Sequence, residues 1–296
     1  MDGNLDKILE ILENDIYDIN ISKYFSKPSF LVGLISLSAE NKVGISGFDA
    51  LDYSKLNYLN RSGFLEILGK DCLNNNENDI ATIHKLTLID ENIWEKAKDI
   101  DKLVVNILKN LKFDYSAFDN FYKSFNWIIR ELLGNVDTHS QADFSKKGCV
   151  FMMQVYKEIG TLNFSISDNG IGFKESFRGS HYFDENKEDD YFIHLAMNKG
   201  ITTSNEGKGN GLYGMKEILK ATNSSMKILS GNYIYKLING EEIGFEKING
   251  YWKGVLLDIE FNMSNIGCET INNLIQRGVL KAPVSIDEMD DLDDLF

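Results

Sequence analysis

The sequence predicts a mixed α/β protein in which a small first part precedes a larger second one. Over residues 1–90, short strand patterns alternate with helical patterns, as expected for a small α/β layer. From about residue 115 onward, amphipathic helical patterns are interleaved with alternating strand patterns, two of which are separated by a single turn. We therefore expect both parts to pack helices against a sheet.

Apolar spacing defines the elements of the first part. Residues 4–22 carry apolar side chains along one side of a helix. Residues 28–41 have a proline near their start and an apolar face that suits a helix packed on a sheet. The remaining patterns predict a strand at 42–48, a short helix within 52–69 that ends at Gly69, and a strand at 79–89.

The second part begins with helical patterns at 92–112 and at about 116–140. The strand patterns "GCVFMMQVYKE" and "TLNFSISDNG" follow, with Gly160 in the turn between them, which is typical of a hairpin. The stretch 173–206 is polar, charged and interrupted by glycines. The last patterns predict a helix at 211–222, a strand region from 225, a strand at 254–262, and a tail from 266 with one short helix.

Composition argues against several classes of function. The formal net charge is −14, whereas binding to nucleic acid or to an anionic membrane surface relies on clustered Lys and Arg. The three cysteines, Cys72, Cys149 and Cys268, lack the spacing of a metal site or a disulfide framework. The acidic N-terminus is unlike a signal peptide, and no apolar run approaches a membrane span. We expect a cytoplasmic protein with no nucleic-acid or membrane partner.

A polar stripe lies on the helix predicted at about 116–140. Glu131, Asn135 and His139, in "ELLGNVDTHS", are spaced i, i+4 and i+8 and so share one face. Another face is apolar and carries Phe125, Ile128, Ile129, Leu132, Leu133 and Val136. Most polar stripes are solvated surface, so a functional interpretation of this one depends on partners elsewhere in the chain.

Two glycine-rich runs supply candidate partners. "DNGIGF" (168–173) ends a predicted strand, and "GKGNGLYG" (207–214) opens a predicted helix. Helix N-termini and glycine-rich turns present unpaired backbone N–H groups, which favour phosphate. These runs therefore indicate a site for phosphate, and three nucleotide-binding motifs could account for the second run.

Two familiar phosphate motifs do not account for the second run. A P-loop needs a glycine five residues before Gly207 and Ser or Thr after Lys208, but Thr202 and Gly209 occupy those positions. Gly209, Gly211 and Gly214 match the dinucleotide spacing, but no strand runs directly into them. Both interpretations are rejected.

A third interpretation uses all three segments in order: E-x-x-x-N on a helix, D-x-G-x-G after a strand, and G-x-G-x-G-L before a helix. This set, over residues 115–262, resembles the GHKL ATP-binding family of gyrase, heat-shock chaperones, mismatch-repair ATPases, histidine kinases and anti-sigma-factor kinases. The resemblance implies a two-layer α/β sandwich ATP-binding domain over 113–265, with ATP and Mg²⁺ as cofactors. The chain would then divide into 1–112, 113–265 and 266–296.

The resemblance also implies a role for each motif residue. Asn135 would bind Mg²⁺ through its amide oxygen, and Glu131 would orient or deprotonate a hydroxyl or water near the γ-phosphate. Asp168 would accept the adenine amino group, and residues 173–206 would form a mobile lid. The remaining nucleotide-binding residues would be Gly170 and Gly172 beside the base, and Gly207, Lys208, Gly209, Gly211 and Leu212 at the phosphates.

The histidines have weaker assignments. His139 is similar in position to a histidine of anti-sigma-type kinases, but a capping or packing role accounts for it equally well. The other three, His84, His181 and His194, are expected to be structural.

Family features narrow the expected function. Glu131 stands where sensor kinases usually carry Asn, and no segment resembles the phospho-acceptor "HELRTP". Gyrase-like and chaperone-like proteins carry a large downstream domain, which the tail from 266 is too short to form. The segments "FLVGLISLSA" and "NYLNRSGFLEILG" are similar to STAS-like domains, although an unrelated small α/β domain remains an alternative.

We therefore expect a regulatory ATPase switch that couples nucleotide state and lid closure to a protein partner. The alternatives are an anti-sigma-type Ser/Thr protein kinase and a nucleotide-gated binding module that hydrolyses nothing. Stress signalling and antiviral defence are suggested only by the processes in which other members of the family take part.

The acidic tail at 284–296 is the expected contact with a partner. Blocks of like charge are usually solvated extensions, and that alternative stays open here. However, large apolar residues recur among the acids at spacings of three or four: Ile286, Met289, Leu292, Leu295 and Phe296. On a helix they would form a narrow apolar stripe, so this tail or the first domain is expected to bind another protein or a second copy of the chain.

Overall fold

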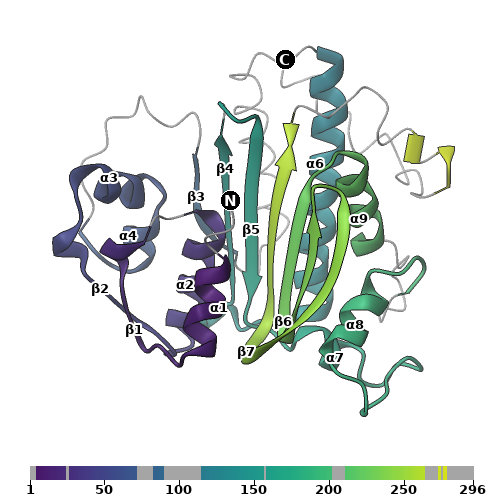
Figure 1. Ribbon diagram of the computed structural model, residues 1–296, viewed down its shortest axis with the longest axis horizontal. Helices are drawn as coiled ribbons and strands as arrows, with labels where there is room; N and C mark the ends of the chain where they lie inside the picture. The colour runs from purple at the N-terminus through teal and green to yellow at the C-terminus, as the bar shows by residue number, and fades with distance from the viewer. Residues whose placement is uncertain are drawn as a thin grey trace.

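The computed structural model describes residues 5–24, 27–71, 83–89, 115–156, 158–201, 211–263, 273–274 and 276–278, with the backbone alone at 83–87, 115–123 and 146. The helix expected at 92–112, the glycine run at 207–209 and the acidic tail at 284–296 lie outside these residues. Within them the fold is mixed α/β, as predicted: helices pack on a five-stranded antiparallel sheet, beside a small parallel pair of strands (Figure 1).

The large sheet is built mainly from the second part of the chain. Its strands lie in the order β3-β4-β5-β7-β6, and every neighbouring pair is antiparallel. The predicted hairpin is confirmed, because Tyr156 pairs with Thr161 and Cys149 with Asp168. The strand bounds are β3 (Ile83–Ile89), β4 (Cys149–Tyr156), β5 (Thr161–Asp168), β6 (Ser225–Ile238) and β7 (Glu241–Asn262).

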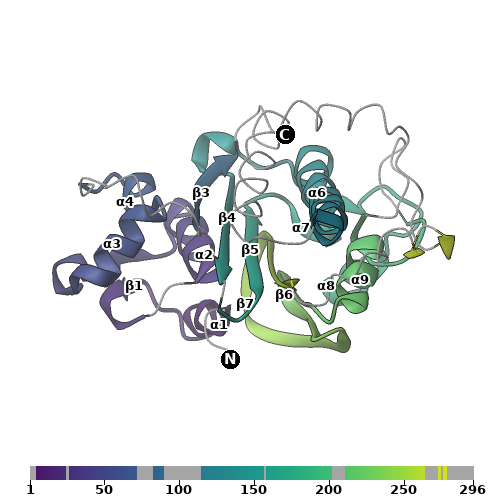
Figure 2. The same ribbon diagram turned by 90° about the horizontal axis from the view of Figure 1, so that it is seen from above.

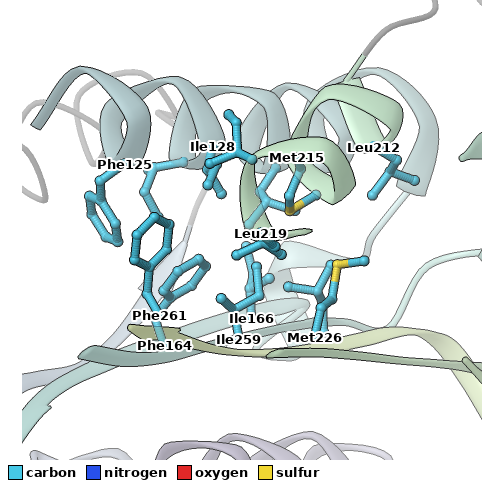
Figure 3. Packing of buried hydrophobic residues seen from close by; sticks show 14 of the residues in the cluster. Phe125, Ile128, Phe164, Ile166, Leu212, Met215, Leu219, Met226, Ile259 and Phe261 are labelled. Carbon is cyan, nitrogen blue, oxygen red and sulfur yellow. The ribbon is translucent and has the colours of Figure 1, made fainter. Parts of the chain in front are cut away.

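One face of the sheet is covered by α6 (Tyr115–Asn135) and α9 (Gly211–Ala221). The apolar face predicted for the first of these helices is buried throughout, from Phe125 to Val136. The Phe125 and Phe164 rings meet edge to face with their centroids 5.2 Å apart, a favoured geometry for aromatic pairs. Figure 3 shows side chains from both helices pointing onto the sheet in one continuous core.

The other face is covered by the first part of the chain, namely α1 (Leu5–Glu13) and α2 (Pro28–Ala39) (Figure 2). Side chains of these helices share one buried cluster with sheet residues such as Met152 and Leu256. Helix α2 is buried from Pro28 to Leu37 on every side. This explains why its sequence is almost wholly apolar, since a helix without a solvent face needs no polar stripe.

A small layer completes the first part. Strands β1 (Asp18–Asn20) and β2 (Gly44–Ser46) pair in parallel, and α3 (Tyr53–Arg61) and α4 (Phe64–Ile67) follow. The helix expected at 4–22 ends at Glu13, because Asp15 adopts a left-handed backbone with φ 48° and a strand then begins. Asp52 caps α3 by accepting a hydrogen bond from the Lys55 N–H at 2.8 Å.

Strand β3 corrects the expected grouping of the elements. The sequence pattern predicts that the strand at 79–89 belongs to the small layer of residues 1–90, but β3 pairs with β4 in the large sheet. An unpaired edge on β4 would leave a row of backbone N–H and C=O groups without partners, and β3 satisfies them.

The polar stretch at 173–206 is folded wherever it is described. It contains α7 (Gly172–Ser176) and α8 (Asp189–Ala196), and their neighbourhood buries Phe177, Phe192 and Met197. The aromatic residues scattered through this polar sequence therefore form a local core beside β6. Within the described residues, no helix is both long enough and apolar enough to cross a membrane.

Candidate functional site

Three elements carry the candidate residues to one end of the large sheet. Strand β5 ends at Asp168, α6 ends at Asn135, and α9 begins at Gly211. Helix α7 starts directly after the β5 turn and contacts both β6 and β7. The arrangement can be followed in Figure 1, where α7 lies at the end of the sheet toward which β5 runs.

The end of α6 differs from the straight helix that was expected. At Val136 the chain changes to a π-helical turn, Val136–Ser140, which ends where Gln141 takes a left-handed backbone with φ 51°. Glu131 and Asn135 keep the predicted one-turn spacing, and His139 lies in the wider turn. Such single wide turns occur frequently at functional sites.

Glu131 lies against the start of α9. A Cβ added to Gly211 would overlap the Glu131 Oε2 atom, so the carboxylate occupies the place of a side chain there. Two residues separated by 80 positions in sequence are thereby brought together. The neighbouring Leu212 side chain is buried in the core, so only its backbone can face a ligand.

Asp168 is the central acidic group of the site. It is 7% exposed, and its Oδ1 accepts a hydrogen bond from the Gly170 N–H at 2.9 Å. Burial raises the pKa of the Asp168 carboxyl to about 7, against the opposing effect of backbone N–H donors such as that of Gly170. Among the described residues, no Lys or Arg forms an ion pair with it.

The turn that follows Asp168 depends on its glycines. Gly170 lies so close to Ser140 that a Cβ would overlap the Ser140 carbonyl oxygen. Gly172 has φ +74°, a conformation that side chains other than glycine rarely adopt. The predicted residues Asp168, Gly170 and Gly172 therefore form one compact turn at the strand end.

A residue that the sequence interpretation missed completes this turn. Gly254 in β7 has φ +77°, and a Cβ there would overlap the Asp168 carbonyl oxygen and lie 2.7 Å from its Oδ1. Its carbonyl accepts a hydrogen bond from the Ser230 hydroxyl at 2.7 Å. The available signal was a glycine inside a strand pattern, "YWKGVLL", which often marks a close backbone approach.

The remaining candidates differ in how much the structure describes. Asn135 is half-buried, and its side chain does not cap the turn that follows. Burial lowers the pKa of His139, because it disfavours the charged imidazolium. Gly207, Lys208 and Gly209 lie outside the described residues, so at the start of α9 the structure describes the contact of Gly211 with Glu131 but not the glycines that precede it.

Two other histidines contact aromatic rings. His181 packs against Tyr182 and His194 against Phe245, with ring centroids 3.7 Å and 6.3 Å apart. Of His84 the backbone alone is described.

The described part of the chain holds no group of three or more His, Cys, Asp and Glu residues suited to a metal ion. Of the cysteines, Cys149 is buried opposite Asp168, and burial raises the pKa of its thiol.

In comparisons with known proteins, no protein-family model and no curated protein matches the chain. The fold and the site define a mixed α/β protein in which a buried acidic strand end, a glycine turn and two helix ends meet. The functional argument therefore depends on the chemistry of these residues.

Proposed function

We propose that this chain binds ATP with Mg²⁺ in the manner of GHKL proteins and acts as a regulatory ATPase switch. The observation that carries the proposal is the Asp168 carboxyl, buried at a strand end and paired with no cation among the described residues. Burying a carboxyl in this way costs free energy, and such costs persist mainly where a function requires the group.

Adenine suits this carboxyl chemically. The exocyclic amino group of adenine would donate a hydrogen bond to Asp168, whereas guanine would present a carbonyl oxygen to an acceptor. The close backbone at Gly170, Gly172 and Gly254 leaves no side chain between Asp168 and a flat base. These features support adenine over guanine as the base.

The other end of the site suits phosphate and a hard cation. The backbone N–H groups at the start of α9 favour an anion, and in this proposal Gly207, Lys208, Gly209, Gly211 and Leu212 surround the phosphates. The Asn135 side-chain oxygen is a ligand type that Mg²⁺ accepts. When bound, Mg²⁺ would neutralise phosphate charge. Asn135 is half-buried at the end of α6, and in this proposal it contributes one ligand.

Glu131 is the proposed general base. Its carboxylate lies at the start of α9, on the proposed phosphate side of the site, where it would orient or deprotonate an attacking water.

Residues 173–206 would act as a lid, and the tail at 284–296 or a STAS-like first domain would bind the partner. A Ser/Thr protein kinase and a binding module that hydrolyses nothing remain alternatives. Release of γ-phosphate that is lost in Glu131→Gln would favour the ATPase.

The proposal is tested by calorimetric titration with ATP, ADP and GTP in the presence of Mg²⁺. We expect ATP and ADP to bind, GTP to bind at least about tenfold more weakly, and Asp168→Asn to abolish binding, because the amide puts a donor beside the adenine amino group.

Asp258→Asn is the matched control. Asp258 in β7 is likewise a carboxyl whose pKa burial raises, but it accepts hydrogen bonds from Ser165 and from Ser29 of α2, the helix that covers the opposite face of the sheet from α6. We expect this variant to bind ATP as the wild type does. A wild-type protein that binds neither ATP nor ADP at millimolar concentration would rule out the proposed function.

A further inference from the structure

We propose that Ser140 is a positioning residue that holds the base-binding turn, residues 168–172, in register with the end of α6. The inference rests on the proposed function, which assigns the base to Asp168 and the metal to Asn135. Ser140 itself contacts neither of these side chains in any hydrogen bond of the described residues. Its role would be to fix the two ends of the site relative to each other.

The Ser140 hydroxyl closes the wide turn at the end of α6. It donates a hydrogen bond to the Val136 carbonyl at 2.6 Å and accepts one from the Ala142 N–H at 3.0 Å. Ser140 is 7% exposed, so water cannot readily replace either bond. The side chain therefore sets the path by which the backbone leaves the helix.

The Ser140 carbonyl contacts the base-binding turn directly. The Ile171 N–H donates to it at 2.8 Å, and Gly170 packs directly on the same oxygen. A small movement of this carbonyl would either break the hydrogen bond or collide with Gly170. The position of the turn therefore depends on this oxygen atom, which the hydroxyl of its own residue holds in place.

A second set of hydrogen bonds joins the same two segments. The Asp143 N–H donates to Asn169 Oδ1 at 3.0 Å, and the Asn169 N–H donates to the Gly148 carbonyl at 2.9 Å. Asn169 is 6% exposed. Because donors run in both directions across this contact, the loop at 140–148 and the turn at 168–172 form one unit.

This unit links the two proposed ends of a nucleotide. Asn135 lies one wide turn before Ser140, and Asp168 lies two residues before Gly170. A ligand that spans the base and metal ends must match both at once, so an error in their relative placement weakens binding without removing any direct contact. Ser140 contributes to that relative placement, because its hydroxyl bonds at the end of α6 and its carbonyl bonds to the turn at 168–172.

Ser62 provides a matched control for the loss of a hydroxyl. It also lies at the end of a helix, α3, it is 0% exposed, and its hydroxyl donates to the Leu59 carbonyl at 2.8 Å. Ser62→Ala should therefore cost a comparable free energy of unfolding to Ser140→Ala. Among the described residues, its hydroxyl and its N–H donate only to carbonyls of α3, so an effect on the turn at 168–172 that Ser140→Ala alone produces is specific to Ser140.

The first test is hydrogen–deuterium exchange in the full chain without nucleotide. We expect Ser140→Ala to raise the exchange rate of the Ile171 amide by about tenfold, the equivalent of one weakened hydrogen bond. Ser140→Thr, which keeps the hydroxyl, and Ser62→Ala should each leave it within about twofold. An unchanged rate in Ser140→Ala, or an equal rise in Ser62→Ala, would overturn the positioning role.

The second test is the affinity for ATP with Mg²⁺. Ser140→Ala should weaken it by about tenfold, while Ser140→Thr and Ser62→Ala stay within about threefold of the wild type. Unchanged affinity in Ser140→Ala would overturn the inference. A wild type that binds no ATP would instead overturn the proposed function, and the exchange measurement would still decide whether Ser140 holds the turn.

Discussion

The Asp168 carboxyl shows how one residue can lower the stability of a fold. Its pKa is raised to about 7 because burial penalises the charged form more than nearby backbone N–H groups favour it. The corresponding carboxyl of the unfolded chain titrates near pH 3.9. Between these two values the folded state binds more protons than the unfolded state, so the free energy of unfolding falls as pH rises.

This titration predicts that Asp168→Asn stabilises the protein without nucleotide at pH 8. The amide keeps an oxygen that can accept from the Gly170 N–H but carries no charge to bury. The gain should be on the order of 2 kcal/mol at pH 8 and should shrink toward zero as pH falls to 4. Urea denaturation at several pH values measures it. A variant that is less stable than the wild type at pH 8 would contradict the assigned cause.

At the scale of elements, the geometry of β7 decides how closely it approaches the turn after β5. Gly254 and Gly244 lie in the same strand with φ +77° and φ +103°, but their surroundings differ. A Cβ at Gly254 would overlap Asp168, whereas a Cβ at Gly244 would have no heavy atom within 4 Å. Substitutions at these two glycines therefore distinguish the free-energy cost of a positive φ from the cost of a steric overlap with Asp168.

We predict that Gly254→Ala costs at least about 2 kcal/mol more in free energy of unfolding than Gly244→Ala. Both variants impose a positive φ on alanine, at about 1 kcal/mol, but only Gly254→Ala also displaces Asp168. Denaturant unfolding of the two variants provides the comparison. Equal destabilisation would show that contact with Asp168 does not constrain this position.

The end of α6 illustrates a second property of elements. The buried apolar side chains from Phe125 to Val136 continue across the change from α-helix to π turn, so burial in the core does not explain why the helix widens there. The hydrogen bonds of the Ser140 hydroxyl occur at the end of the π turn. Local spacing predicts a helix here, whereas its winding depends on contacts with the turn after β5.

At the scale of the whole molecule, the sheet is buried on both faces. Helices α6 and α9 cover one face, and α1 and α2 cover the other (Figure 2). A Cβ at Gly33 of α2 would meet the side chains of Ile8 in α1 and Leu256 in β7, so helix and sheet pack closely. Because they share a core, we expect the first part of the chain to unfold together with the sheet.

Leu34→Ala tests this shared core. Leu34 in α2 is 0% exposed, and its truncation should lower the free energy of unfolding by about 3 kcal/mol. Amide exchange in β4 and β5 should accelerate as much as exchange in α2, since all three belong to one cooperative unit. Faster exchange confined to α1 and α2 would show that the first part opens independently of the sheet.

The sequence by itself determined the local features: the class of fold, the β4–β5 hairpin, the apolar face of α6, and the order of the acidic and glycine motifs. These follow from spacing within a few residues. The tertiary structure alone decided that β3 joins the large sheet, that α1 and α2 cover its outer face, and that Gly254 and Ser140 adjoin Asp168 and Gly170. Those outcomes depend on contacts between segments distant in the chain, and periodicity carries no information about which distant surfaces will meet.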